Sequence, residues 1–376
     1  MEHALILGGY GATGRILARL LLDHTSLHVT LAGRDAARAA AAASALGGRA
    51  DWRVADAASA ESLMAALAGV DLLLVTASTV LHTQTVARAA LRAGADCYDI
   101  LYSPAKLGVL RSLEPEIRRA GLCFITDGGL HPGLPGVMVR RAAEELDELH
   151  SAVVGSAIQQ DWRAVDPSPE ALADFLDMIV GIDTAHFAEG EWRWLRMRDS
   201  GVRRRMEFGA PFGMRSCYAM ALEELRTLPQ QYPSLRSTGF YVGGFSALVD
   251  WGVIPLAMLG QRFAPQRSRP WLARLLGASL RHGSTPPFRT VLKLEATGLR
   301  GGQPRTLQLE VGHEDGYFLT AACVLAGVRQ LIDGSIRRPG VWLQAQAVAP
   351  ARMLADLAAV GVDVGRFGPE PVSAGA

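Results

Sequence analysis

The chain has 376 residues, of which 49% are hydrophobic and 20% are charged, and its formal net charge is +1. The length favours two domains with a large buried core, and the balanced charge excludes the basic profile of a nucleic-acid-binding protein. The four cysteines are far apart and the first residues already have the pattern of a core strand. We therefore expect reduced thiols, no metal site, no leader peptide and a cytoplasmic location.

The first predicted elements are a strand over Ala4–Leu7, a glycine-rich turn and a helix over Arg15–Asp23. The turn fits both G-x-G-x-x-G, which begins at Gly9, and G-x-x-G-x-x-G, which begins at Gly8, so the first turn glycine remains ambiguous. Glycine allows backbone N–H groups at a helix start to approach a pyrophosphate. The turn therefore predicts a dinucleotide site formed by Gly8, Gly9, Tyr10, Gly11, Ala12, Thr13 and Gly14, with Gly11 closest to the phosphates and Gly14 allowing tight helix packing.

Strands and helices alternate as far as about residue 128, which predicts an α/β fold with a doubly wound parallel sheet over residues 1–128. The further expected strands are Leu27–Ala32, Trp52–Val54, Asp71–Val75, Asp96–Ile100 and Leu122–Thr126. The expected helices between them are Asp35–Leu46, Ala60–Leu67, Thr79–Ala93 and Pro104–Ala120.

The residues after the predicted strands indicate which cofactor the sheet binds. An NAD site places a carboxylate at the end of the second strand, whereas this chain has Gly33-Arg34-Asp35 there. We expect Arg34 to bind a 2′-phosphate and Asp35 to cap the next helix, which favours NADP and makes NAD the less favoured cofactor. Asp56 is placed to reach the adenine, and the small residues Thr76, Ala77 and Ser78 leave room beside the nicotinamide ribose.

The alternation ends at a loop rich in glycine and proline, and a different pattern follows. We predict a second, α+β domain over residues 129–315 with strands at Ala152–Gln159 and Phe187–Leu195, a hairpin of Thr290–Ala296 and Arg305–Gly312, and helices at Val137–Leu146, Pro169–Val180 and Ser216–Leu228. Residues 316–376 return to helix, at Gly316–Asp333 and Ala351–Val360.

The most hydrophobic stretch is Gly239–Gly260, which is nearly long enough to cross a bilayer. Asp250 near its centre and Pro255 argue against an integral membrane segment. We expect buried or dimer-interface helices, with peripheral membrane contact as the less favoured alternative.

Four stretches together resemble the saccharopine dehydrogenase family, including its carboxynorspermidine-dehydrogenase-like members. They are the GGYGATG turn, Gly94-x-x-Cys97-Tyr98-Asp99, the loop Gly129-Leu-His131-Pro-Gly133-Leu, and the tail from Thr320 to Val341 with Leu331-Ile-Asp-Gly334. The resemblance implies a Rossmann domain, an α+β dimerisation domain and a tail that packs back on the first domain. It also implies a homodimer that moves a hydride to or from the carbon–nitrogen bond of a small, amino-acid-like substrate.

The resemblance and the loop positions together suggest His131, Tyr102 and Asp99 as catalytic candidates. The family loop carries an acid where this chain has His131, which points to a substrate other than saccharopine. Histidine has a pKa suited to proton transfer, and Tyr102 is a candidate acid that Asp99 could orient. Each residue also has a structural alternative, namely a hydrogen-bonded loop histidine, an aromatic ring packed on Pro104, and a capping carboxylate.

Two other functions remain open at this point. A trans-acting enoyl reductase would use the same fold to reduce a carbon–carbon double bond of a lipid or polyketide chain, and the apolar Gly239–Gly260 stretch suits such a substrate. The GGYGATG turn is also similar to that of NmrA-like sensors, which bind NADP without turning it over.

Overall fold

The computed structural model describes residues 1–365 apart from 166, 168, 182, 197 and 244–248. The chain divides into two compact units, Met1–Leu134 with Tyr317–Ala349 and Pro135–Gly316 with Pro350–Ala376. The sequence placed the boundaries after residues 128 and 315 and assigned the whole tail to the first domain. The structure differs in the last helix, because Pro350–Ala359 belongs to the second unit.

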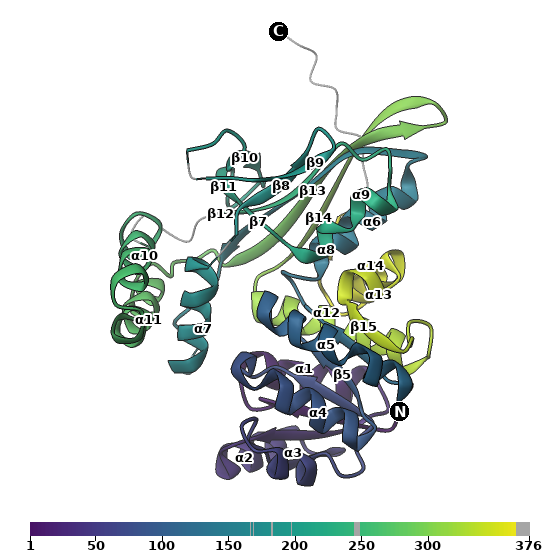
Figure 1. The fold of residues 1–376 in the computed structure, drawn as a ribbon, viewed down its shortest axis with the longest axis vertical. Coiled ribbons are helices and arrows are strands. Elements are labelled where there is room, and N and C mark those ends of the chain that lie inside the picture. Colours follow the sequence, from purple (N-terminus) through teal and green to yellow (C-terminus); the bar gives the residue numbers. More distant parts are fainter. Residues whose placement is uncertain (166, 168, 182, 197, 244–248, 366–376) are drawn as a thin grey trace. The chain divides into compact units, whose positions relative to one another are not determined.

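The first unit is built on a seven-stranded sheet in which every neighbouring pair is parallel. Its strands are β1 (His3–Leu7), β2 (His28–Gly33), β3 (Ala50–Val54), β4 (Leu72–Val75), β5 (Asp96–Asp99), β6 (Cys123–Thr126) and β15 (Gly340–Leu343). The order β15-β6-β5-β4-β1-β2-β3 is that of a Rossmann sheet with one strand added at its edge. The predicted fold class is therefore confirmed, and Figure 1 shows the yellow β15 returning to this unit from the tail.

The helices of the first unit connect and cover these strands. They are α1 (Ala12–His24), α2 (Ala36–Leu46), α3 (Ala60–Ala66), η1 (Val80–His82), α4 (Thr83–Ala93), α5 (Pro104–Arg119), α12 (Gly316–Ile332) and α13 (Gln344–Ala347). The strand Leu72–Val75 is buried along its whole length, as expected for a parallel strand covered on both faces.

The second unit contains a mixed nine-stranded sheet. Its strands are β7 (Glu148–Gln159), β8 (Ala185–Ala188), β9 (Glu191–Trp194), β10 (Arg203–Glu207), β11 (Met214–Met220), β12 (Ser237–Gly243), β13 (Arg289–Arg300), β14 (Gln303–His313) and β16 (Asp363–Val364). The main path runs β10-β11-β12-β7-β13-β14-β16, and β8 pairs with both β12 and β9. The long β13–β14 hairpin turns at Gly301 and Gly302, as the sequence predicted.

The helices of the second unit are α6 (Leu134–Glu145), α7 (Pro169–Val180), α8 (Glu223–Arg226), α9 (Leu228–Gln231), η2 (Val249–Val253), α10 (Ile254–Phe263), α11 (Pro265–His282) and α14 (Pro350–Ala359). The segments α7, η2, α10 and α11 pack around one apolar cluster of their own. Among the described residues, no helix is both long and apolar enough to cross a membrane.

Two elements of the second unit differ from the sequence-based expectation. The predicted helix Ser216–Leu228 is wrong in its first part, because those residues belong to β11 and pair with β10 and β12, whereas Glu223–Arg226 forms the short helix α8. Cys217 and Ala219 alternate into the apolar core there, so sheet pairing overrides local helix propensity. The strand expected over Phe187–Leu195 is a hairpin, since the chain turns at Glu189 and Gly190, both with positive φ.

The apolar stretch Gly239–Gly260 also departs from expectation. It begins as the sheet strand β12, and residues 244–248 lie outside the described part of the chain. Of the two expected placements, burial within the chain is wrong for α10, since Met258 and Leu259 are 50% and 56% exposed. The placement at a dimer interface stays a prediction.

Candidate nucleotide-binding site

The turn between β1 and α1 requires glycine at three positions for its own packing. Gly8 has a φ of +92°, and a Cβ on it would lie 2.8 Å from the Ala77 backbone nitrogen. A Cβ on Gly9 would lie 2.8 Å from the Cα of Leu31, and one on Gly14 would lie 2.3 Å from the carbonyl oxygen of Gly8. The structure therefore needs both Gly8 and Gly9, and Gly14 allows the close helix–turn contact that the sequence predicted.

Gly11 differs from the other three, because its nearest neighbour for an added Cβ is the Gly8 oxygen at 3.1 Å. Gly11 is the N-cap of α1, and among the described residues no side chain caps this helix start and no acid lies in its first turn. The first N–H groups of a helix lack partners within the helix and carry a partial positive charge. A pyrophosphate fits this bare, uncapped helix start, and a side chain at residue 11 would fill the space that it needs.

The residues after β4 lie beside this turn, at the point where the strand order reverses. Strand β1 pairs with β4, and the backbone N–H and hydroxyl of Thr76 donate to the carbonyl of Leu7 at 2.9 and 3.1 Å. Ala77 packs against Gly8, and Thr76, Ala77 and Ser78 are all half-buried. The structure thus brings these three predicted residues next to the turn, at the edge where Rossmann sheets bind their ligand.

Tyr10 connects the turn to the end of β2. A Cβ on Gly33 would lie 2.5 Å from Cε1 of the Tyr10 ring, and the backbone N–H of Asp35 donates to the Tyr10 hydroxyl at 3.2 Å. The space beside Gly33 is therefore occupied by the Tyr10 ring. The guanidinium of Arg38 lies 4.9 Å from the centre of the same ring.

Two exposed arginines follow β2, of which the sequence analysis identified one. Arg34 lies in the loop, and Asp35 accepts a hydrogen bond from the Arg38 backbone as the N-cap of α2, as predicted. Arg38 lies in the first turn of that helix, where its charge adds to the positive end of the helix dipole. Its spacing of four residues from Arg34 was the signal that sequence reasoning missed.

Asp56 follows β3 and is half-buried. Its Oδ1 accepts from the Ala58 N–H at 3.0 Å, and its own N–H donates to the Ser62 hydroxyl at 3.0 Å. The carboxylate thus takes part in the turn that leads into α3, a structural role that it holds in addition to any contact with adenine.

Asp99 belongs to a buried charge cluster rather than to an exposed strand end. Its Oδ1 accepts from the Leu101 N–H at 2.7 Å and from Lys106 Nζ at 3.1 Å, and Lys106 Nζ also lies 3.7 Å from Oδ1 of Asp127. The Lys106 side chain is fully buried and also donates to the Leu101 carbonyl. Burial raises the pKa of Asp127 to about 6, although the Lys106 ammonium acts in the opposite direction.

The loop that carries His131 is fixed by the residues around it. Gln344 accepts from the Gly129 N–H at 2.8 Å and donates to the Gly129 carbonyl at 3.1 Å. The buried Tyr98 hydroxyl donates to the same Gln344 oxygen at 2.8 Å, and the Gly128 N–H donates to the Asp99 carbonyl at 3.0 Å. The loop is therefore a rigid part of the first unit, positioned by β5 and by the returning tail.

His131 itself has a buried ring nitrogen, Nε2. Burial lowers the pKa of His131 to about 4, so the imidazole is neutral at pH 7. The imidazole at this position therefore offers hydrogen bonds or a base rather than a stored proton. Tyr102 is half-buried and directly precedes Ser103, the N-cap of α5.

Two residues that organise this loop were missed by sequence reasoning. Lys106 had a readable signal, because it shares the buried face of α5 with Leu110, Leu113 and Ile117. A lysine at a core-facing helical position indicates a buried acid nearby. Gln344 lies 211 residues after Gly133, and no local pattern connects it to the loop.

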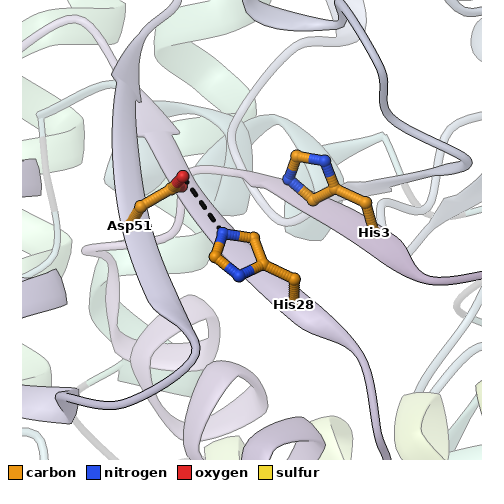
Figure 2. A group of neighbouring side chains, drawn as sticks. All are labelled: His3, His28 and Asp51. Carbon is orange, nitrogen blue, oxygen red and sulfur yellow. Dashed lines mark ion pairs between the residues drawn. The ribbon is translucent and has the colours of Figure 1, made fainter.

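A second polar cluster, His3, His28 and Asp51, lies at the opposite ends of the strands, where β1, β2 and β3 begin (Figure 2). Their ligand atoms lie within 4.8 Å of one another. His28 Nε2 lies 3.1 Å from Asp51 Oδ2, and His3 Nε2 lies 2.7 Å from the Thr30 hydroxyl, which also donates to Asp51. These contacts join three neighbouring strands away from the nucleotide turn, so we assign the cluster a structural role.

The comparisons with known proteins agree with this geometry. Residues 4–125 match the family model described as the saccharopine dehydrogenase NADP binding domain. The chain shares its fold with apo saccharopine dehydrogenase (L-Glu forming) from Saccharomyces cerevisiae, with 18% identity, a TM-score of 0.69, and coverage of 98% of this chain and 100% of that chain. The resemblance predicted from the sequence is confirmed for the NADP-binding domain by the family model and for the overall fold by this structure.

Other solved structures overlap less well. An engineered D-amino acid dehydrogenase bound to NADP+ gives a TM-score of 0.47 at 16% identity, over 96% of this chain and 99% of that chain. The C. glutamicum DAP dehydrogenase in complex with DAP gives a TM-score of 0.47 at 14% identity, over the same shares of the two chains. No curated protein sequence matches the chain.

Proposed function

We propose that this chain, whose residues 4–125 form a saccharopine dehydrogenase-type NADP-binding domain, is an NADPH-dependent oxidoreductase that acts on the carbon–nitrogen bond of an amino-acid-like substrate. The observation that carries the proposal is the bare turn at Gly11, which opens onto the uncapped start of α1 beside Thr76–Ser78. The full-length likeness to the saccharopine dehydrogenase fold supports the choice of a carbon–nitrogen bond. The cofactor supplies the hydride when it is bound.

The residues of the chain would bind, orient and move protons. The N–H groups of Ala12 and Thr13 and the dipole of α1 would hold the pyrophosphate, and Arg34 and Arg38 would bind the 2′-phosphate. His131 would offer a neutral imidazole to the reacting nitrogen or carbinolamine, and Tyr102 would supply a phenol hydroxyl as a second proton-transfer group. Asp99 and Lys106 act through the loop and are positioning residues.

The proposal is tested by measuring steady NADPH oxidation by the full chain. The substrates are a panel of 2-oxo acids or aldehydes, each paired with an amino acid. We expect turnover with at least one pair, and a fall in kcat of about 100-fold or more in His131→Ala, in the range that general acid–base groups contribute. His82→Ala, at a half-buried histidine of η1, is the matched control.

Each other outcome identifies a different function. Turnover of an enoyl thioester instead of an imine would assign the chain as an enoyl reductase. Tight NADPH binding without turnover of any substrate would make it a sensor. Unchanged kcat in His131→Ala would remove this residue from the reaction.

Cofactor preference gives a separate prediction. Arg34→Glu is expected to lower the ratio of NADPH to NADH affinity by about tenfold or more, because the carboxylate repels a 2′-phosphate and accepts from a ribose hydroxyl. Arg38→Glu is expected to act in the same direction. Titration of both cofactors by fluorescence measures the ratio, and Arg92→Glu on the exposed face of α4 is the control. If the ratio stays unchanged in Arg34→Glu, Arg34 does not recognise the 2′-phosphate.

A further inference from the structure

The helices α10 and α11 of the second unit expose a set of large apolar side chains. Six of them are between 36% and 75% exposed: Leu256 at 41%, Met258 at 50%, Leu259 at 56% and Phe263 at 75% on α10, and Trp271 at 46% and Leu275 at 36% on α11. We call these six residues the apolar face. Scattered exposed hydrophobic residues are ordinary, but six on two packed helices indicate an interaction surface.

The opposite side of the same two helices already forms a core. Val253, Ala257, Leu272 and Leu276 are buried and pack with Leu176 of α7 and other apolar residues of that helix. A Cβ on Gly260 would lie 2.8 Å from Cδ1 of Leu272, so α10 and α11 are in close contact. The apolar face is therefore additional to the core that holds these helices together, and its exposure is not needed for their folding.

The charge on α10 and α11 has one sign only. Residues 251–294 contain neither aspartate nor glutamate, whereas α10 and α11 carry five arginines. One of them, Arg269, pairs with Asp174 and Asp177 of α7 at 3.3 and 2.7 Å. The other four, Arg262, Arg267, Arg274 and Arg281, are exposed.

We infer that the apolar face and its four exposed arginines dock this protein on an anionic phospholipid bilayer surface. Interfacial helices place Phe, Trp and Leu at the boundary between headgroups and acyl chains and place arginines beside anionic headgroups. The helices then lie on the bilayer without crossing it, which agrees with their length and composition.

The charge pattern favours a bilayer over a second copy of the chain. In an isologous dimer this face would meet its own copy, and arginines would face a surface that has no acid on either helix. An anionic bilayer supplies the opposite charge. The inference does not depend on the proposed catalytic activity, since it concerns residues outside the nucleotide site.

Co-sedimentation of the full chain with phosphatidylcholine vesicles, with and without phosphatidylglycerol, tests the inference. We expect binding to the anionic vesicles that weakens as salt is added, and little binding to phosphatidylcholine alone. Arg262→Gln/Arg274→Gln is expected to lower the partition coefficient by about tenfold or more, since each basic residue near an anionic surface contributes about fivefold. Leu259→Ser/Phe263→Ser is expected to lower it by about tenfold or more as well, because it removes apolar area that would be buried in the bilayer interface. The controls are Met214→Ser and Arg203→Gln, exposed residues of β11 and β10.

Light scattering and thermal unfolding of each variant complete the test. We expect an unchanged molar mass and an unchanged Tm, so that a loss of vesicle binding reports the surface alone. The inference is overturned if the wild-type chain does not bind anionic vesicles, or if the variants bind as well as the wild type. It is also overturned if Leu259→Ser/Phe263→Ser converts a dimer into a monomer, which would make the apolar face a contact between two copies.

Discussion

The Gly11→Val variant is expected to bind NADPH about 100-fold more weakly than the wild type, or about 2.8 kcal/mol in binding free energy. Valine would place two methyl groups where the backbone must approach the pyrophosphate, so the phosphates would lose hydrogen bonds to the start of α1. Fluorescence titration with NADPH measures the affinity, and urea unfolding of the apo protein measures stability.

The apo protein should tolerate this change, which makes the variant informative. Gly11 has a φ of −73° and ψ of 174°, which any residue adopts, and a Cβ there requires only that the Gly8 carbonyl oxygen at 3.1 Å shift by a few tenths of an ångström. Gly14→Val would be a poor substitute, because its Cβ would lie 2.3 Å from the Gly8 oxygen and the turn itself would fail. Gly108→Val, at a helical glycine with nothing within 4 Å of an added Cβ, is the matched control. An unchanged NADPH affinity in Gly11→Val would refute the proposed phosphate site.

The second large effect is expected at the buried lysine. Lys106→Met should lower the free energy of unfolding by about 3–5 kcal/mol, because it leaves Asp99 and Asp127 buried without the ammonium between them. Chemical denaturation at neutral pH measures the loss. Arg119→Met, at an exposed residue of the same helix, should change stability by no more than about 0.5 kcal/mol.

Neutralising the acids should restore part of that stability. In the background of Lys106→Met, adding Asp99→Asn and Asp127→Asn removes the unpaired charges, so the triple variant should be more stable than the single variant. If it is not, the loss in Lys106→Met comes from packing and not from charge.

The pH dependence follows from the raised pKa of Asp127. Between the ordinary value of 3.8 and about 6, the native state holds more protons than the unfolded state. This group therefore makes stability fall as pH rises through that range, and Asp127→Asn should remove its contribution to the slope.

The sequence by itself determined the nucleotide-binding half of the protein. The strands β1, β4 and β6 are short, largely apolar runs, and the helices of this unit are marked by local signals such as Asp35 and Ser103 at N-caps and Gly94 after α4. A chain of alternating buried strands and helices is expected to form one arrangement, a parallel sheet with helices on both faces and right-handed connections. The glycine turn was also recognisable, because its motif spans only seven residues, although two of the steric constraints behind it come from Leu31 and Ala77 elsewhere in the chain.

Only the tertiary structure decided how the loop at His131 is held and what charge its histidine carries. Lys106, Asp99 and Asp127 meet from three different elements, and Gln344 reaches the loop from the tail as β15 adds to the sheet. The neutral His131 results from burial, which no neighbour in sequence reveals.

The second unit was predicted less well for the same physical reason. Met214–Met220 becomes a strand because β10 and β12 offer backbone partners on both sides, and those partners lie outside the segment whose local pattern was read as helix. The apolar stretch before residue 260 reads the same in sequence whether it is core or surface. Its helix α10 has its apolar face exposed because the side toward α7 and α11 is already filled. The local sequence motif thus determined where the turn must have glycine, whereas long-range packing decided which charges are paired and which apolar side chains remain exposed.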